Sequence, residues 1–212
     1  MRGQLVLYRV CRDALVGFCR VFWRLRVDGL EHVPDGPFVL APVHRSNIDT
    51  PLVAAVTRRR LRYMGKDAMW KYRAPGWLFS ALGGFPVRRG MADRAALRRC
   101  LEVLGEGEPL VIFPEGGRRS GPVVAELSEG AAYLAIRAGV PIVPVGIGGS
   151  ERAMPRGSKM LHPVRVHLVV GPPLHPPQAD GGRAPRRAVH ELTERLQAEL
   201  QRLFAEAEAK AG

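Results

Sequence analysis

Residues 110–138 read LVIFPEGGRRSGPVVAELSEGAAYLAIRA, and the order of their segments predicts the fold. A short apolar run, Leu110–Phe113, has the length and composition of a buried strand, and Glu126–Ala138 is a longer amphipathic segment of helical length. A loop rich in Gly and charged residues separates the two. A strand followed by a helix in this way is the repeating unit of α/β folds with a parallel sheet.

The same alternation extends over most of the chain. Further strands are expected at Phe38–Pro42, Leu61–Gly65, Phe85–Arg88, Ile142–Ile147 and Val164–Val170. Further helices are expected at Pro51–Arg59, at Ala92–Leu104 and from Ala184 to about Ala209. We therefore expect an α/β domain with a mixed, mostly parallel sheet flanked by helices. Because ligand sites of open α/β sheets lie beyond the carboxyl ends of their strands, the functional residues are expected just after these strands.

The length of 212 residues and the charge bound the possible functions. A composition of 46% hydrophobic and 25% charged residues is ordinary for a globular protein and excludes a disordered chain. Only three cysteines occur, which excludes a disulfide scaffold and fits a reducing compartment. The formal net charge is +12, and 28 of the 32 basic residues are Arg. This charge points to nucleic acid, phosphorylated substrates or an acidic membrane as partners, although a high-GC genome would also favour Arg.

The first 27 residues are expected to form an amphipathic helix ahead of the main domain at 28–212. Between Leu5 and Leu25 there is no Pro, and Asp13 is the one acid. Residues at steps of three and four form an apolar face, namely Leu7, Cys11, Ala14, Phe18, Phe22 and Leu25. The opposite face carries Arg2, Arg9, Arg20 and Arg24. This pattern fits a helix in a membrane interface and a helix packed on the protein's own core equally well.

Signals for crossing a membrane are missing from the sequence. No run reaches the roughly 18 apolar residues of a spanning helix, and no segment has the uninterrupted apolar core and cleavage site of a signal peptide. We therefore expect the chain to stay in the cytoplasm.

A histidine and an aspartate follow the first strand, in the stretch His44-Arg45-Ser46-Asn47-Ile48-Asp49. An imidazole titrates near neutral pH and can take a proton from a hydroxyl, and a carboxylate on its other nitrogen would set its tautomer. The same spacing fits a helix that Asp49 or Asn47 merely caps, with His44 bonded to backbone. From these residues alone, both interpretations stay open.

Three further segments combine Gly, Pro or charge with a strand. In Gly83–Arg89, glycines permit close backbone approach and two Arg could hold a phosphate, although an edge strand blunted by charge has the same pattern. In Leu110–Ser120, Arg118 could bind an anion and Glu115 could hold a hydroxyl or the arginines, with a turn and a surface ion pair as the alternative. In Val140–Ile147, the internal proline predicts the wall of a cleft or an edge strand.

Together, these four segments resemble the motifs of the lysophosphatidic acid acyltransferase family, the 1-acylglycerol-3-phosphate O-acyltransferases. That family carries His-x4-Asp, then a Gly-rich segment ending in Arg, then Phe-Pro-Glu-Gly-Thr-Arg, then Val-Pro-[Ile/Val]-x-Pro-[Val/Ile]. The matching segments here follow the same order: His44–Asp49, Gly83–Arg89, Phe113–Arg118 and Val140–Val145. Each motif is weak alone, but four in order over roughly residues 30–175 are specific.

The resemblance implies an enzyme that moves a fatty acyl group from acyl-CoA or acyl-carrier protein to the hydroxyl of 1-acylglycerol-3-phosphate in phospholipid biosynthesis. It implies that His44 is the general base and that Asp49 orients it. It also implies that the residues that bind the substrate are Lys66, Arg89, Glu115, Gly116 and Arg118. No cofactor and no metal are expected, and the enzyme would lie peripherally on an anionic membrane, at its cytoplasmic face.

Three positions depart from the family pattern. Gly117 stands where Thr is usual, so a hydroxyl contact is lost there. Arg88 stands where an acid often precedes the motif Arg, and Arg119 stands where a small polar residue is common. The acceptor site is therefore expected to be more cationic than is usual in the family. Four residues between the first two motifs could line an acyl groove or simply pack in the core: Trp70, Trp77, Leu78 and Phe79.

Alternatives come from other classes of function. Within the acyltransferases, the acceptor could be glycerol-3-phosphate or another lysolipid. A basic nucleic-acid-binding module would explain the charge, but the Arg residues are dispersed and no helix-turn-helix or RNA-binding aromatic signature occurs. A metal enzyme is disfavoured because the six His residues show no His-x3-His spacing and no Cys-x2-Cys occurs.

Overall fold

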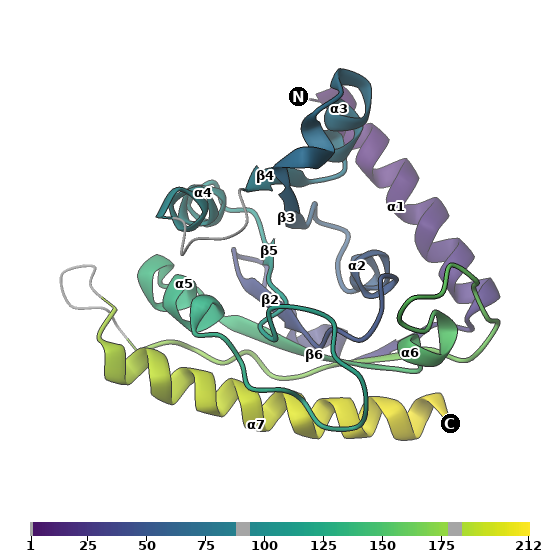
Figure 1. Ribbon diagram of the computed structural model, residues 1–212. Helices are drawn as coiled ribbons and strands as arrows, with labels where there is room; N and C mark the ends of the chain where they lie inside the picture. The colour runs from purple at the N-terminus through teal and green to yellow at the C-terminus, as the bar shows by residue number, and fades with distance from the viewer. Residues whose placement is uncertain (1, 88–93, 178–183) are drawn as a thin grey trace.

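The structure is a computed structural model that describes residues 2–87, 94–177 and 184–212 (Figure 1). Seven strands of the described residues form one sheet in the order β1-β7-β6-β2-β5-β3-β4. Their bounds are β1 Arg26–Asp28, β2 Val39–Pro42, β3 Arg62–Lys66, β4 Gly84–Val87, β5 Leu110–Val111, β6 Ile142–Gly148 and β7 His167–Val170. All neighbours are parallel except β6 and β7, so the expected mixed, mostly parallel sheet is confirmed.

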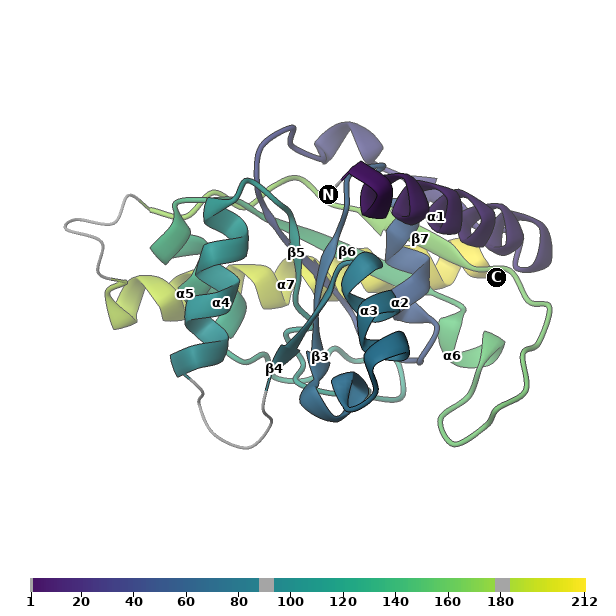
Figure 2. The ribbon, with the colours of Figure 1, turned by 90° about the horizontal axis from the view of Figure 1, so that it is seen from above.

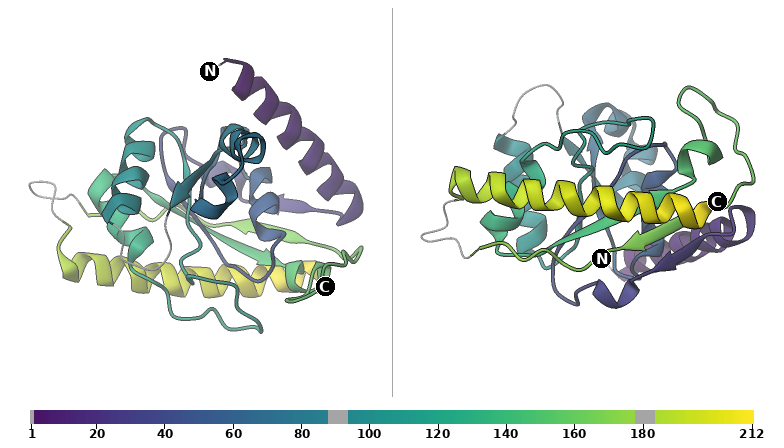
Figure 3. Two further views of the ribbon diagram at one scale, coloured as in Figure 1. Left: turned by 45° about the horizontal axis from the view of Figure 1, so that its top comes forward. Right: turned by 90° about the horizontal axis from the view of Figure 1, so that it is seen from below.

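Helices cover both faces of this sheet (Figures 1 and 2). One face carries α4 (Arg94–Gly105), α5 (Gly130–Ala138) and α7 (Arg186–Ala211), and α7 runs across it over β6 and β7 (Figure 3, right). The other face carries α1 (Arg2–Phe22), α2 (Asp49–Leu52) and α3 (Arg73–Ala81). The remaining short elements are η1 (Leu30–His32), η2 (Val53–Ala55), η3 (Asp67–Trp70) and α6 (Ser150–Ala153). No helix in the described ranges is both long enough and apolar enough to cross a membrane.

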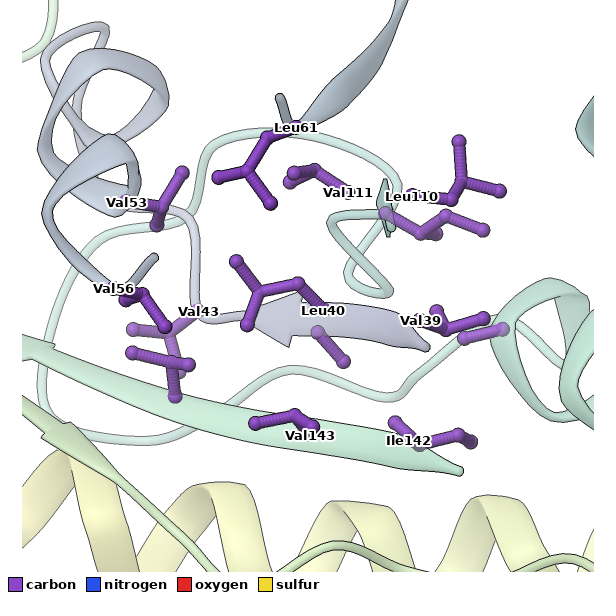
Figure 4. Packing of buried hydrophobic residues seen from close by; sticks show 14 of the residues in the cluster. Val39, Leu40, Val43, Val53, Val56, Leu61, Leu110, Val111, Ile142 and Val143 are labelled. Atoms are coloured by element: carbon purple, nitrogen blue, oxygen red, sulfur yellow. The ribbon is translucent and has the colours of Figure 1, made fainter. Parts of the chain in front are cut away.

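The core is built from the apolar strands that the sequence predicts. Leu40 and Val43 belong to one buried cluster with Leu61 and the η2 side chain Val53 (Figure 4), and all four are completely buried. The helix expected over Pro51–Arg59 is shorter than predicted, because α2 continues only as the single 3-10 turn η2. The β-branched residues that follow lose side-chain freedom in a helix, which favours this early end.

Strand β6 corrects the expectation for Val140–Ile147. It lies in the middle of the sheet, between β7 and β2, and all seven of its residues are buried. The proline is tolerated because the β6–β7 pairing begins at Val145, so Pro144 lies just outside that ladder and its carbonyl accepts the Gly171 N–H at 3.0 Å. In β4, Pro86 is tolerated for a different reason, since β4 is an edge strand.

Helix α1 packs through a different face from the predicted one. The buried side chains of the helix are Tyr8, Val16 and Cys19, and Trp23 is buried directly after its end; Val16, Cys19 and Trp23 belong to the main core. The predicted apolar face is only partly turned outward. Its members Ala14 and Phe18 are exposed, Phe18 by 46%, and the neighbouring Val10 and Val21 are 63% and 83% exposed. The other members of that face are half-buried or buried, namely Leu7, Cys11, Phe22 and Leu25. The helix therefore has both a face that packs on the domain and exposed apolar side chains away from it. Figure 3 (left) shows α1 lying along the outside of the fold.

The topology brings the predicted motifs together. Strands β2, β5, β3 and β4 are consecutive parallel neighbours, so their carboxyl ends lie at the same edge of the sheet. His44 follows β2, Lys66 ends β3, Val87 ends β4 and Phe113 follows β5. This edge is where the sequence places the chemistry.

Candidate active site

His44 and Asp49 form a hydrogen-bonded pair in the loop after β2. His44 Nδ1 lies 3.0 Å from Asp49 Oδ2, and the side chains are 17% and 0% exposed. The same Asp49 oxygen accepts the backbone N–H groups of Arg45 and Ser46 at 2.6 and 2.7 Å. These bonds hold the carboxylate in one position and leave His44 Nε2 as the ring nitrogen that can accept a proton.

The helix-capping alternative for Asp49 is wrong. The residue at the start of α2 is Ile48, and no side chain caps this helix. Asp49 lies in the first turn, and its carboxylate faces back toward the preceding loop rather than along the helix. The sequence predicted that His44 and Asp49 could interact, and the tight loop between them brings their side chains into hydrogen-bond contact.

Glu115 is buried and holds the loop that carries His44. Its carboxylate accepts the backbone N–H of His44 at 2.9 Å and that of Ala125 at 3.1 Å. Arg45 Nη1 donates to both Glu115 oxygens, at 2.9 and 2.7 Å, and neither side chain of this ion pair is exposed. The alternative of a surface ion pair is therefore wrong. The side chain that pairs with the Glu115 carboxylate is Arg45, which comes from the first motif, and not one of the arginines in the same loop as Glu115.

A cavity of about 440 Å³ opens beside this pair. His44 lines it and stacks on Phe113, with ring centroids 4.0 Å apart. Gly116 and Gly117 form part of its wall, and Gly116 has a backbone φ of +69°, which favours glycine. An added Cβ at either glycine would meet no atom, so the wall is open at these positions.

A second, mainly apolar cavity of about 570 Å³ adjoins the first. Both are lined by Thr50, Tyr63, Met64 and Gly65, which form their common border. The second cavity continues between β3, α3 and the packed flank of α1, where Trp70 and Phe79 line it. Trp77 and Leu78 are instead 55% and 41% exposed, so the expected core packing is wrong for both.

The remaining predicted binding residues lie around this edge or outside the described ranges. Arg118 is half-buried in the loop after β5, directly after Gly117, and none of the described hydrogen bonds involves its guanidinium. Lys66 ends β3, where it pairs in register with Val87. Arg89, like Arg88, lies outside the described residues. The structure thus brings His44, Asp49, Glu115 and Gly116 together with the backbone of Lys66 and Arg118 nearby along the same edge.

The glycines of the second motif allow neighbouring segments of backbone to pack closely. An added Cβ at Gly83, whose φ is +95°, would lie 2.1 Å from the Leu61 carbonyl oxygen. An added Cβ at Gly84 would lie 2.9 Å from the Phe79 carbonyl oxygen. The close backbone approach that the sequence predicts is therefore with β3 and α3.

Cys100 lines the His44 cavity, but it is a poor nucleophile. Burial raises the pKa of its thiol to about 12, so the thiol remains protonated at neutral pH. Direct attack by a hydroxyl that His44 activates needs no such nucleophile.

Sequence reasoning missed Arg45 and the border between the two cavities. Arg45 stands inside the first motif, but a buried arginine there has no sequence signal, because charged residues are usually exposed. Its guanidinium also lies 4.6 Å from the Phe204 ring centroid of α7 and donates to the Val123 carbonyl at 3.1 Å. Arg45 thereby connects the loop that carries His44 to α7 on the opposite face of the sheet.

Comparisons with known proteins agree with this geometry. The family model described as Acyltransferase matches residues 24–148, which include all four motifs. A 1-acyl-sn-glycerol-3-phosphate acyltransferase of Bacillus subtilis is 28% identical over 93% of this chain and 96% of its own. The chloroplastic enzyme LPAT1 of Arabidopsis thaliana is 30% identical over 75% of this chain, and the match covers 46% of that relative. This chain therefore spans about half the length of LPAT1.

A solved structure extends the likeness to the fold. The crystal structure of the 1-acyl-sn-glycerophosphate (LPA) acyltransferase PlsC from Thermotoga maritima superposes with a TM-score of 0.76 at 25% identity. The match covers 97% of this chain and 80% of that one. The resemblance noted in the sequence is thereby confirmed, and the chain belongs to the acyltransferase family that contains the 1-acyl-sn-glycerol-3-phosphate acyltransferases.

Proposed function

We propose that this chain transfers a fatty acyl group from an acyl thioester, acyl-CoA or acyl-carrier protein, to the free hydroxyl of 1-acylglycerol-3-phosphate. The observation that carries this proposal is the His44–Asp49 pair, with its 3.0 Å bond, in a cavity that borders a second, apolar one. The activities of the relatives, several of which are 1-acyl-sn-glycerol-3-phosphate acyltransferases, support the choice of acceptor.

The chemistry needs one proton acceptor. His44 Nε2 takes the proton of the acceptor hydroxyl as its oxygen attacks the thioester carbonyl carbon. The carbon–sulfur bond then breaks, and the leaving thiolate takes the proton from the imidazolium. Asp49, hydrogen-bonded at Nδ1, stabilises the imidazolium between these steps. General-base catalysis of this kind contributes roughly 10²–10⁴-fold to the rate.

The two cavities divide the substrates between them. The apolar cavity of about 570 Å³ has the size and lining of a ligand pocket and would hold the acyl chain. The His44 cavity would hold the glycerol hydroxyl and the thioester carbonyl. Arg118, with Lys66 at the end of the neighbouring strand β3 and with Arg89, would bind the acceptor's phosphate, because guanidinium forks match phosphate oxygens. Glu115 is a positioning residue in this scheme, since its carboxylate is already bonded to His44 N–H and Arg45.

The exposed apolar face of α1 would hold the enzyme on the membrane, where a lysophospholipid acceptor lies. Val10, Phe18 and Val21 are exposed on α1, and the neighbouring α3 adds exposed Trp77 and Leu78. Contiguous exposed apolar side chains are characteristic of membrane or protein contacts. Arginines beside this face would meet anionic headgroups at the cytoplasmic surface.

The proposal is tested by measuring thiol release from acyl-CoA with a panel of acceptors: 1-acylglycerol-3-phosphate, glycerol-3-phosphate and a lysolipid without a free phosphate monoester. We expect the highest kcat/KM with 1-acylglycerol-3-phosphate and a loss of roughly 10²–10⁴-fold in kcat for His44→Ala. Asp49→Asn should lower kcat while the melting temperature shows that the fold is kept. Wild-type turnover by His44→Ala would exclude the mechanism, and preference for another acceptor would reassign the substrate.

A further inference from the structure

A cationic pocket of about 590 Å³, separate from the two cavities described above, lies at the other end of the strands from His44. Its walls come from the first half of α1, the turn before β3 and the turn before β5. Because β3 and β5 begin at this edge and His44 follows the end of β2, the pocket is separate from the catalytic edge. Five arginines and two acids line it, namely Arg9, Arg12, Arg58, Arg59, Arg60, Asp13 and Glu108.

Two of the arginines build the pocket walls. Arg59 donates to the carbonyl oxygens of Asp35 and Gly107 at 2.7 and 2.6 Å, which joins the loop before β2 to the turn before β5. Arg12 donates from Nε to the Ala54 carbonyl at 3.0 Å and pairs with Asp13 at 2.6 Å, which joins α1 to η2. The donors of these two side chains are thus directed at the protein's own oxygens.

Three arginines keep at least one donor that forms no hydrogen bond within the described residues. Arg9 and Arg58 are exposed, and no hydrogen bond or ion pair joins either to another described residue. Both lie close to Asp13, whose pKa is lowered by its hydrogen bond from Arg12 and further by the charges of Arg58 and Arg9. The Nε of Arg60 is buried and donates no hydrogen bond, although Glu108 lies 3.5 Å away.

We propose that this pocket binds the phosphate group of an anionic ligand, with Arg9 and Arg58 as the recognising side chains. The two acids are already engaged, Asp13 with Arg12 and Glu108 with Arg60 and Arg62, so the pocket keeps an excess of positive charge. Two guanidinium groups from different elements, α1 and the turn before β3, can bind one phosphate from two sides. This inference goes beyond the proposed function, because it needs neither His44 nor acyl transfer.

The phosphate could belong to an anionic phospholipid or to a soluble phosphorylated molecule. Arg9 stands next to Val10, which is 63% exposed, so a lipid headgroup in the pocket would leave the apolar face of α1 free to enter the acyl layer. A soluble ligand would need only the guanidinium groups. The chemistry recognised is the same, and the two sources are separated by experiment.

The test compares the full-length protein with R9Q/R58Q and with a matched control, R186Q/R195Q, that removes two exposed arginines of α7 on the opposite face. Binding to vesicles of phosphatidylcholine alone and of phosphatidylcholine with phosphatidylglycerol is measured by co-sedimentation. Binding of inorganic pyrophosphate is measured by calorimetry at low ionic strength. Circular dichroism melts establish that all three proteins are equally folded.

We expect R9Q/R58Q to bind phosphatidylglycerol vesicles about thirtyfold more weakly than wild type, with phosphatidylcholine binding unchanged. R186Q/R195Q should bind both kinds of vesicle nearly as wild type does. A loss confined to pyrophosphate would support the site and assign it to a soluble phosphate. An equal loss of binding in both double variants would show that binding depends on net charge alone, which would overturn the proposal. Unchanged binding of R9Q/R58Q to both the vesicles and pyrophosphate would also overturn it.

Discussion

Arg45 and Glu115 form an ion pair whose side chains are both completely buried, with Arg45 Nη1 2.7 Å from Glu115 Oε2. The other Glu115 oxygen accepts the backbone N–H of His44 at 2.9 Å. The loop that carries the proposed general base is therefore attached to the loop after β5 by a buried charge pair. A buried charge that loses its partner is costly, because water cannot replace it.

Glu115→Ala should destabilise the protein by about 3–5 kcal/mol, because it leaves Arg45 charged and unpaired in the interior. Glu115→Gln keeps an acceptor oxygen for the His44 N–H and should cost less. Chemical denaturation measures both, and kcat for thiol release should fall further in Glu115→Ala, where the His44 N–H loses its acceptor. In R45M/E115Q the buried charges are gone and the acceptor is kept, so stability should recover relative to Glu115→Ala. Wild-type stability of Glu115→Ala would show that the pair is not buried in solution.

Arg118→Ala should raise the KM for 1-acylglycerol-3-phosphate with little change in the KM for acyl-CoA. The physical reason is that a guanidinium which makes no described bond within the protein is available for the acceptor's phosphate. Steady-state kinetics with each substrate varied in turn measures the two constants. The control is Arg137→Ala, an exposed arginine of α5. Equal effects of the two substitutions on the acceptor KM would count against the assignment.

Ala54→Leu should shift acyl-donor preference toward shorter chains. Ala54 lines the apolar cavity and is only 6% exposed, so added carbon atoms occupy space that the acyl chain would use. The measurement is the ratio of kcat/KM for a medium-chain and a long-chain acyl-CoA. Ala205→Leu, at an exposed position of α7, is the matched control. An unchanged ratio in Ala54→Leu would place the acyl chain elsewhere.

Val10→Ser/Val21→Ser should weaken binding to phosphatidylcholine vesicles without lowering the melting temperature. Both side chains are exposed, at 63% and 83%, so their removal costs the fold little and reduces only the apolar surface that would enter the bilayer. Val123→Ser, at a position 69% exposed in the loop after β5, is the control. Vesicle flotation measures the difference.

Deleting the whole helix is a poorer test of membrane binding. Val16, Cys19 and Trp23 are part of the main core, so a protein that lacks residues 1–26 would lose stability together with any membrane contact. If Val10→Ser/Val21→Ser bound vesicles as wild type does, α1 would serve packing alone.

The departures from the predicted elements have identifiable causes. The long helix expected after Pro51 ends at Ala55, where β-branched residues follow. The proline in β6 predicted an edge strand or cleft wall, yet β6 is central. Pro144 is tolerated there because the β6–β7 ladder begins at Val145, so the ladder needs no hydrogen bond from the Pro144 nitrogen. In α1, the apolar spacing correctly predicted a helix, but Phe18 of the predicted face is exposed and the packed face includes Tyr8. The Tyr8 hydroxyl accepts the Leu61 N–H at 3.1 Å, a contact that the spacing does not signal.

The alternation of apolar runs and amphipathic segments, together with four ordered motifs, determined the α/β class, the family and the His44–Asp49 pair from the sequence alone. These features are local: strand length, helical spacing and a loop of six residues need no distant partner to be recognised. Only the tertiary structure decided that Glu115 pairs with Arg45, which face of α1 is free and where the two cavities meet. Each of these depends on contacts between segments far apart in the chain, and burial, which sets the strength of a charge pair, arises only when those segments pack together.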